Sequence, residues 1–382
     1  MKIAYIHTGL FPSNSPSITF ATGTAVSLAN KFERCYFFIK RNSRSSATEI
    51  LKNNFNLAHP ENLELIQITP ILKTNFFYFK KIYKTLKKLI KSNELDAIVV
   101  RNITFLPYLA KLNTTFSIPT YFESHDFYAD LSVRTDINKN KKLRYQKLEK
   151  KYIPKITGII CLQHAQKQWY KKSFPTQKII VARTGIEKII SKPFANRSFI
   201  SYIGSLDPHK GVDVLIKALS LTKSQPRLLI VGGKNEKEKR AILNLAQKHH
   251  NPAQIEITGW VGKQQLLKYL IKTKLGIIPL QDTFFNRFLT SPLKLFDFYS
   301  FGIPVIASDL PTTRELIVEN ETGLFFTPND PIDLAEKIDT LIFNKNIIEQ
   351  MSKNIYQTAQ QFLWSKRAEL IYSAIESEII NR

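Results

Sequence analysis

The chain has 382 residues, of which 43% are hydrophobic and 12% aromatic, and it carries only two cysteines, Cys35 and Cys161. This length favours two domains, and this composition excludes a disordered, collagen-like or low-complexity protein. Two cysteines exclude a disulfide scaffold and do not by themselves make a cysteine-based zinc site.

The net charge of +24 is spread unevenly along the chain. Residues 1–200 hold 33 lysines and arginines against 12 aspartates and glutamates, so this half alone carries +21. A basic half beside a near-neutral half indicates that one lobe faces an anionic surface, and nucleic acid and anionic lipid are both candidates on charge alone. No stretch approaches the roughly 20 consecutive apolar residues of a membrane span. We therefore expect a cytoplasmic protein, either soluble or bound peripherally at the inner face of the plasma membrane.

In the first half, short β-rich runs alternate with helical periodicity. We expect strands at 2–7, 97–101, 120–123 and 158–162. Residues 79–91 predict an amphipathic helix, with Phe79, Ile82 and Leu86 on one face and lysines on the other. The aromatic run Phe76–Phe79 is expected to pack into the core.

The second half repeats this alternation more clearly. Strands are expected at 199–204, 227–231, 254–258, 275–279 and 304–307, and helices at 211–221, 235–248, 263–272, 292–301, 311–319 and 330–343. Two such runs predict an α/β protein of two doubly wound Rossmann-like domains facing across a cleft, with the join near 189–198. Ligands of such sheets bind at the carboxyl ends of the strands, so the loops there are the candidate site.

The segment from Thr290 to Asp297 has the pattern of a helix that begins at a phosphate site. Ser291 is a suitable N-cap and Pro292 suits the first helical position, which leaves the N–H groups of Leu293 and Lys294 directed out of the helix end. An ordinary helix start with a Lys294–Asp297 pair is the alternative.

Two further loops place polar residues after strands. Lys210 lies where the loop after 199–204 meets a helix, a natural position for a phosphate counter-charge, although a solvated loop lysine is the commoner case. His125, followed by Asp126, is suited to donating a hydrogen bond to a developing oxyanion or a sugar hydroxyl, and a structural pairing with Asp126 is the alternative. The Asp-x-Asp, Walker and Gly-x-Gly-x-x-Gly motifs are absent, which argues against metal, ATP and nicotinamide chemistry.

Taken in order, several segments resemble the retaining nucleotide-sugar glycosyltransferases of family 4, which are group 1 glycosyltransferases of the GT-B architecture. The resemblance covers most of 199–345, through residues 202–206 with 210–213, 229–232, 257–261, 291–297 with 301–308, 315–317, 322–324 and 328–330. In the first half it is limited to the opening strand, 122–126 and 183–186.

This resemblance implies an N-terminal acceptor-side domain over 1–190, a nucleotide-sugar domain over 199–362, and a final helix over 363–382 that crosses back to the first domain. It implies a metal-independent, retaining hexosyltransferase that moves a sugar from a nucleotide-diphosphate donor to a lipid-linked or polysaccharide acceptor in cell-surface glycan assembly. The nucleotide sugar is a co-substrate, with UDP favoured over GDP, and no cofactor is expected.

The resemblance also implies roles for individual residues. The catalytic residues would be His125, Lys210 and Asp297. The donor's nucleotide and phosphates would contact Ser205, Lys210, Gly233, Trp260, Val261, Thr290, Ser291, Pro292, Leu293, Lys294 and Asp297, and the acceptor and sugar side would be Asn14, Ser15, Glu123 and His125. The sequence departs from the family at Leu289 and Asp297, where the family has two glutamates, and at Ser205, where an arginine is common.

The basic residues of the first half allow two interpretations of what this half binds. Lysines of 80–91 and 141–155 would hold the acceptor domain on an anionic membrane, or they would be solvated helix faces. The competing function is a non-catalytic GT-B-like binding protein that uses its basic lobe for nucleic acid or membrane. No basic stripe is interleaved with exposed aromatics, so nucleic acid is the less favoured partner.

Overall fold

The computed structural model describes all residues except 14, 42, 44, 70–74, 192–196, 250–253 and 382. The chain divides into two compact units. Unit 1 comprises Met1–Gly185, Leu289–Ser291 and Trp364–Arg382, and unit 2 comprises Ile186–Phe288 and Pro292–Leu363.

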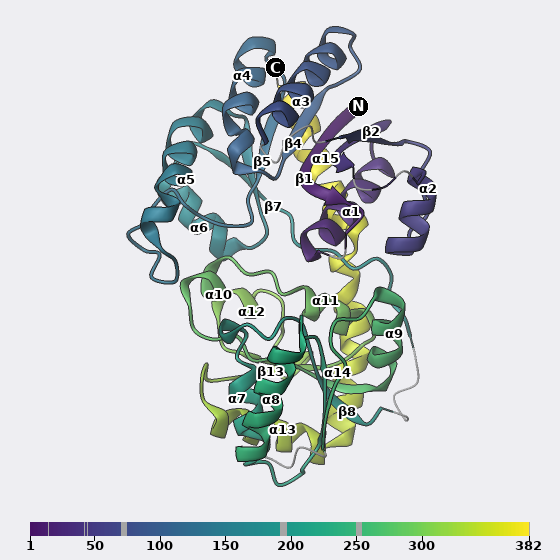
Figure 1. The fold of residues 1–382 in the computed structure, drawn as a ribbon, viewed down its shortest axis with the longest axis vertical. Helices are drawn as coiled ribbons and strands as arrows, with labels where there is room; N and C mark the ends of the chain where they lie inside the picture. The colour runs from purple at the N-terminus through teal and green to yellow at the C-terminus, as the bar shows by residue number, and fades with distance from the viewer. Residues whose placement is uncertain are drawn as a thin grey trace. The chain divides into compact units, whose positions relative to one another are not determined.

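Unit 1 is built on a parallel sheet of seven strands in the order β3-β2-β1-β4-β5-β6-β7 (Figure 1). The strands are β1 (Lys2–Phe11), β2 (Arg34–Arg41), β3 (Leu63–Ile68), β4 (Ala97–Val100), β5 (Thr120–Glu123), β6 (Gly158–Cys161) and β7 (Lys178–Val181). The main helices are α1 (Pro16–Ala29), α3 (Asn75–Lys91), α4 (Leu106–Phe116), α5 (Lys139–Tyr152), α6 (His164–Ser173) and α15 (Trp364–Ile380), with a short α2 (Ala47–Ile50).

The strand order of unit 1 reverses between β1 and β4, and this is where open α/β sheets bind ligands. The last helix of the chain, α15, packs on α1 and β7 of this unit. Its apolar side, through Ala368, Ile371 and Ile375, is buried with β1 and β2 in one core. The end of the chain therefore belongs to the same folded body as its beginning.

Unit 2 has a six-stranded parallel sheet in the order β10-β9-β8-β11-β12-β13, with its reversal between β8 and β11. The strands are β8 (Phe199–Ile203), β9 (Arg227–Val231), β10 (Ile255–Ile257), β11 (Thr273–Ile278), β12 (Val305–Ser308) and β13 (Gly323–Phe326). The helices are α7 (Val212–Leu219), α8 (Glu236–His249), α9 (Lys263–Lys272), α10 (Phe284–Phe288), α11 (Leu293–Ser300), α12 (Pro311–Arg314), α13 (Pro331–Phe343) and α14 (Lys345–Thr358).

The predicted fold class is confirmed for each unit, because both are doubly wound parallel sheets covered by helices. The prediction for the aromatic run before the lysine-rich helix is half wrong. Tyr78 and Phe79 are buried, whereas Phe76 and Phe77, in the first turn of α3, are 52% and 45% exposed. Both cysteines are buried as free thiols. Among the residues that the structure describes, every helix is too short or too polar to span a bilayer.

Candidate active site

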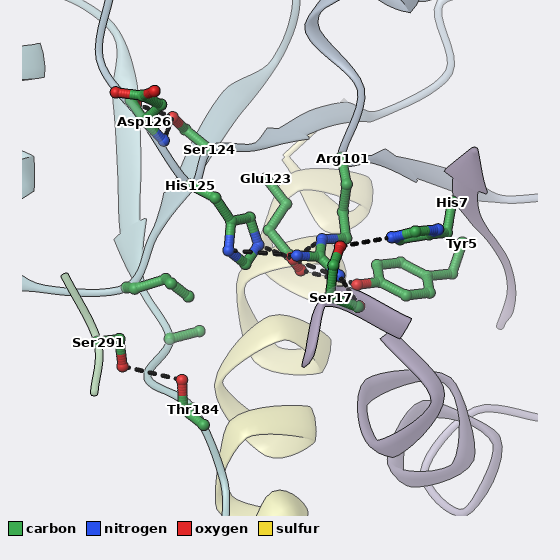
Figure 2. A network of polar contacts seen from close by, with 12 residues as sticks. Tyr5, His7, Ser17, Arg101, Glu123, Ser124, His125, Asp126, Thr184 and Ser291 are labelled. Carbon is green, nitrogen blue, oxygen red and sulfur yellow. Dashed lines mark hydrogen bonds and ion pairs between the residues drawn. The ribbon is translucent and has the colours of Figure 1, made fainter. Parts of the chain in front are cut away.

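The polar centre of unit 1 is the carboxylate of Glu123, which is fully buried at the end of β5 (Figure 2). Its Oε1 lies 2.7 Å from Nε2 of His125 and 3.1 Å from Nε of Arg101, which follows β4. Its Oε2 accepts a hydrogen bond of 2.6 Å from Nη2 of Arg367 on α15. The Tyr5 hydroxyl of β1 donates to the same carboxylate at 3.2 Å. Three strands and the last helix thus meet at one buried charge, beside the reversal point of the sheet.

The hydrogen-bond partners determine the tautomer of His125. The Arg101 guanidinium carries only donors and lies 3.3 Å from Nδ1 through its Nη2, so Nδ1 acts as an acceptor. The proton of the neutral ring is then on Nε2, directed at Glu123. His7 is held in the same way, because the N–H of Gly9 donates to its Nδ1 and its Nε2 faces the Ser17 hydroxyl.

The charges of this centre follow from its burial. Burial alone would raise the pKa of Glu123, but Arg367, the hydrogen bond from His125 and Arg101 together hold that pKa well below its ordinary value. Burial and the nearby Arg101 lower the pKa of His125 to about 4, and burial with Arg101 lowers the pKa of His7 to about 3. The carboxylate is therefore ionised and both imidazoles are neutral at physiological pH.

A polar cavity of ≈ 280 Å³ opens beside His125 in unit 1. It is lined by Arg101, Asn102, Ile103, Thr104, Phe122, Ser124, His125, Asp126, Tyr128, Tyr145 and Glu149. Most of these residues follow β4 and β5 or lie on α5, so the cavity is at the carboxyl edge of the sheet. Its mixture of hydroxyls, amides, aromatic rings and carboxyls suits a polyhydroxylated ligand.

Two carboxyls of the cavity have different surroundings. Asp126 is paired with Arg134, a buried guanidinium that also binds Asp136. Glu149 is fully buried and receives hydrogen bonds from the Tyr128 N–H at 2.8 Å and the Tyr170 hydroxyl at 2.7 Å. Burial raises the pKa of Glu149 to about 8, so at neutral pH this side chain is largely protonated.

In unit 2, the notable charge is Lys294, in the first turn of α11. Its side chain is 8% exposed, and its Nζ lies 3.8 Å from the centroid of the Tyr202 ring. Among the residues that the structure describes, this Nζ has no hydrogen-bond partner. Burial, and then the proximity of Lys210, lower the pKa of Lys294 well below its ordinary value. A buried ammonium without a partner is costly, and a second lysine beside it adds to that cost.

The loop that carries Lys210 is fixed by close backbone contacts. A Cβ at Gly211, where φ is +70°, would lie 1.7 Å from the carbonyl oxygen of Pro279, so only glycine fits there. The buried Asn286 side chain donates to the His209 carbonyl at 2.9 Å and holds the turn from the other side. The loops after β8 and β11 therefore pack backbone to backbone, and this brings Lys210 towards Lys294.

The remaining residues expected on the donor side lie around this pair or in neighbouring loops. The Ser205 carbonyl accepts a hydrogen bond of 2.6 Å from the hydroxyl of Tyr202, the residue whose ring Nζ of Lys294 covers. Asp297 is half-buried on α11, and burial raises its pKa to about 6 against the opposing charge of Lys263. Trp260 is 46% exposed in the loop after β10.

Gly233 and Val261 also lie in loops that follow strands. Gly233 comes after β9 with φ +103°, where a Cβ would be 3.2 Å from Leu206. Val261 lies half-buried beside Trp260 in the loop after β10.

The prediction that Ser291 caps the helix is wrong. Helix α11 begins at Leu293 with Pro292 as its N-cap, because the chain is still extended at Pro292. The Ser291 hydroxyl instead pairs with that of Thr184 at 2.8 Å (Figure 2), and the Thr290 carbonyl accepts from the Gln163 side chain at 3.2 Å. Both contacts lie within unit 1, and the division between the units follows Ser291.

On the acceptor side, the structure changes the interpretation of Glu123. Glu123 was expected to face the acceptor or sugar, but its carboxylate is fully buried and is taken up by internal partners. His125 lies on the cavity wall, with 28% of its side chain exposed. Ser15 is an exposed residue immediately before α1, and Asn14 lies outside the described residues.

Sequence reasoning missed three residues of these sites: Arg101, Arg367 and Tyr202. Arg367 lies 244 positions from its carboxylate partner, so no local pattern connects them. Arg101 and Tyr202 were placed in strands without a role, although a charged residue directly after a buried strand is a usable signal. Among the described residues, no group of three or more histidine, cysteine, aspartate or glutamate side chains is arranged to hold a metal ion.

Comparison with known proteins finds a family similar to the second half of the chain. Residues 186–358 match the family model "Glycosyl transferases group 1". An uncharacterized glycosyltransferase of Methanocaldococcus jannaschii is 25% identical over 208 residues, which is 54% of this chain and 56% of that protein. The aligned part is thus little more than half of that relative.

Solved structures share the whole architecture. Sucrose-phosphate synthase from Thermosynechococcus elongatus superimposes with a TM-score of 0.76 at 17% identity, covering 100% of both chains. HepE of Anabaena, solved with UDP and glucose, superimposes with a TM-score of 0.71 at 16% identity and covers 99% of this chain and 100% of its own. At such identities the likeness establishes the fold, which is that of the GT-B glycosyltransferases.

Proposed function

We propose that this chain, whose fold is GT-B and whose residues 186–358 match the group 1 glycosyltransferases, is a glycosyltransferase that moves a hexose from a nucleoside diphosphate to a glycan or lipid-linked acceptor. The proposed transfer needs no metal and retains the configuration at the anomeric carbon. The bond from that carbon to the diphosphate breaks, a bond to the acceptor oxygen forms, and the acceptor proton leaves with the diphosphate or solvent.

The observation that carries this proposal is the unpaired ammonium of Lys294. It is buried at the start of α11 with Lys210 nearby, in the region where the sheet of unit 2 reverses. Two lysines that repel each other in the free protein stabilise it poorly, and a bound anion reverses the sign of that interaction. The first N–H groups of α11 and its helix dipole favour the same anion.

These residues suit a diphosphate that becomes a leaving group. Negative charge grows on the diphosphate as the sugar departs, and Lys210 and Lys294 are already in place to stabilise it. We assign the ribose to Asp297 and the base to the backbone near Trp260. HepE, of the same fold, binds UDP and glucose, and this supports a uridine nucleotide here.

We assign the acceptor to the cavity of unit 1. The cavity is at the carboxyl edge of the sheet and lined by groups that hydrogen bond to hydroxyls, with Tyr128 and Tyr145 available for contact with a sugar face. The neutral His125 forms part of its wall.

We further propose that unit 1 binds an anionic bilayer, as an enzyme of cell-surface glycan assembly would require. Helix α3 carries six lysines and no acidic residue, and its first turn exposes Phe76 and Phe77. Exposed phenylalanines beside lysines suit the boundary between headgroups and acyl chains. The lysines of α5 add to the same basic surface character.

A thermal-shift screen of nucleoside diphosphates, followed by a donor-consumption assay, tests the proposal. UDP and its sugars are expected to raise the melting temperature, because a ligand of the folded state stabilises it. A donor that gives both stabilisation and turnover supports the enzyme, and the anomer of the product is read by NMR. Absence of any nucleotide effect, together with steeply salt-dependent binding to nucleic acid, would favour the non-catalytic alternative.

A further inference from the structure

We propose that Arg367, on the last helix, and Arg101 are positioning residues. By clamping the Glu123 carboxylate they hold His125 as a neutral ring whose Nδ1 accepts hydrogen bonds at the wall of the unit 1 cavity. The inference rests on the proposed function in one respect, namely that the ligand of this cavity presents a hydroxyl.

The clamp holds the Glu123 carboxylate from two sides. Oε1 of Glu123 serves His125 and Arg101, and Oε2 serves Arg367, so both oxygens are occupied by donors. Arg367 spans further, because its Nη1 donates to the carbonyls of Ala182 and Arg183. The guanidinium therefore fixes the carboxylate relative to the segment after β7, and the carboxylate fixes the ring of His125.

Ring contacts hold the same groups in their planes. The Phe20 ring of α1 lies 4.6 Å from the Arg101 guanidinium carbon and 4.8 Å from that of Arg367. Phe20 also meets His125 edge to face at 4.8 Å. Trp364, one turn before Arg367, packs on Gly23 and Gly185, where a Cβ would approach its indole to 2.7 and 2.4 Å. These contacts fix the first turn of α15, and this turn carries Arg367.

The charges around His125 keep a proton off Nδ1. The titratable groups facing the ring are Tyr5 and His7 from β1, Arg101 after β4, Glu123 on β5 and Arg367 on α15, with Asp126 next in the chain. Two guanidiniums stand against the one carboxylate that touches the ring, and both other titratable neighbours on β1 are uncharged. A positive excess opposes an imidazolium, so Nδ1 stays an acceptor.

This arrangement reverses one role considered for His125. A ring with Nε2–H directed at Glu123 does not donate to a sugar; it accepts from a hydroxyl that replaces Arg101 at Nδ1. The histidine then orients the hydroxyl without changing its own charge. Arg367→Met should release the restraint, because Glu123 would keep one arginine and could stabilise an imidazolium.

Long-range ¹H–¹⁵N spectra of the full-length, histidine-labelled protein test this directly, with His125→Gln used to assign the signal. In the wild type we expect the Nε2–H tautomer and no titration between about pH 5 and about pH 8. Arg367→Met should raise the midpoint of His125 towards the acidic end of that range, because one of the two opposing guanidiniums is removed while burial and Arg101 remain. It should also give the pH profile of kcat a new acidic limb. Arg367→Lys keeps the charge and should leave His125 neutral.

A matched control is Lys178→Met. Lys178 also fastens α15 to the sheet, through the Ala374 carbonyl and Glu378, but it does not contact Glu123, so the His125 signal should not change. An Nδ1–H tautomer, an ordinary titration in the wild type, or a silent His125 in a folded Arg367→Met would each overturn the inference. If Arg367→Met does not fold, the wild-type tautomer and titration decide. No donor is needed, so this result is independent of the nucleotide-binding test.

Discussion

The substitution Lys294→Met separates a binding lysine from a structural one. Methionine has a similar length and keeps the packing against Tyr202, but it removes the ammonium that is buried without a partner. In the free protein this charge lowers the stability of the fold, and in the proposed complex it binds a phosphate. The variant should therefore gain stability and lose nucleotide affinity. Replacement of a lysine with a structural role would instead lower stability.

The magnitudes follow from the contacts. Leaving a buried polar group unsatisfied costs about 1–3 kcal/mol, and the substitution removes this cost. It also removes the cation–π contact with Tyr202, which lowers the gain in stability by about 1 kcal/mol. A net gain of about 1 kcal/mol raises the melting temperature by about 2–4 °C for a unit of this size. A hydrogen bond to a charged group is worth about 1.5–3 kcal/mol, so UDP should bind about 10- to 150-fold more weakly.

The gain in stability should also depend on pH. The pKa of Lys294 is lower in the folded than in the unfolded protein, so the unfolded chain binds this proton more tightly. The wild type therefore becomes more stable as pH rises towards about 10.4, the ordinary lysine pKa, and the advantage of Lys294→Met shrinks over the same range.

Calorimetry with UDP and thermal melts measure both effects. Lys217→Met is the control, because Lys217 is a partly exposed lysine of unit 2 whose partner is Asp213. It should change neither quantity appreciably. A Lys294→Met protein that is less stable than the wild type and binds UDP normally would refute the reasoning.

Three other outcomes are expected. Lys210→Ala should lower turnover by about 100- to 1000-fold with an unchanged circular dichroism spectrum, and near-normal turnover would remove its assigned role. Glu149→Gln should become more stable relative to the wild type as pH rises from about 5 to about 8, by at most about 1.4 kcal/mol per pH unit. The reason is that burial raises the pKa of Glu149 in the folded protein, so deprotonation over this range favours the unfolded wild type. Parallel pH profiles of the two proteins in urea melts would contradict this. Neutralising Lys84, Lys87 and Lys88 together should weaken sedimentation with anionic liposomes by about 100-fold while sparing transfer to a soluble acceptor, and unchanged sedimentation would place the membrane surface elsewhere.

The sheet of unit 2 was largely predictable because its strands are short apolar runs bounded by turns. The strand at Arg227–Val231 matches the prediction residue for residue, and the four other predicted strands differ by one or two positions at their ends, whereas the strand at Gly323–Phe326 was not predicted. Strands with charged ends or partial exposure, such as Arg34–Arg41 and Lys178–Val181, were not predicted, since their patterns are weaker.

The sites divide in the same way. Lys210 was proposed as a site residue because it follows a strand, and its proximity to Lys294 could be expected from strand order alone. The burial of Lys294 without a hydrogen-bond partner could not be predicted, and neither could the burial of Glu123 between two arginines. Hydropathy patterns place charged residues at the surface, so they give no signal for a buried charge. Arg367 reaches the site because the last helix packs on unit 1, and local sequence patterns do not predict that packing. The exposure of Phe76 and Phe77 is a similar failure, because their burial was predicted from their aromatic character and not from their positions on the helix.

A crystal structure of the protein with UDP tests most directly whether Lys294 and Lys210 bind a diphosphate. We expect a diphosphate oxygen about 2.7–2.9 Å from Nζ of Lys294, and a second oxygen at about the same distance from Nζ of Lys210. A diphosphate bound elsewhere, with Lys294 still covering the Tyr202 ring and lacking any anion, would contradict it.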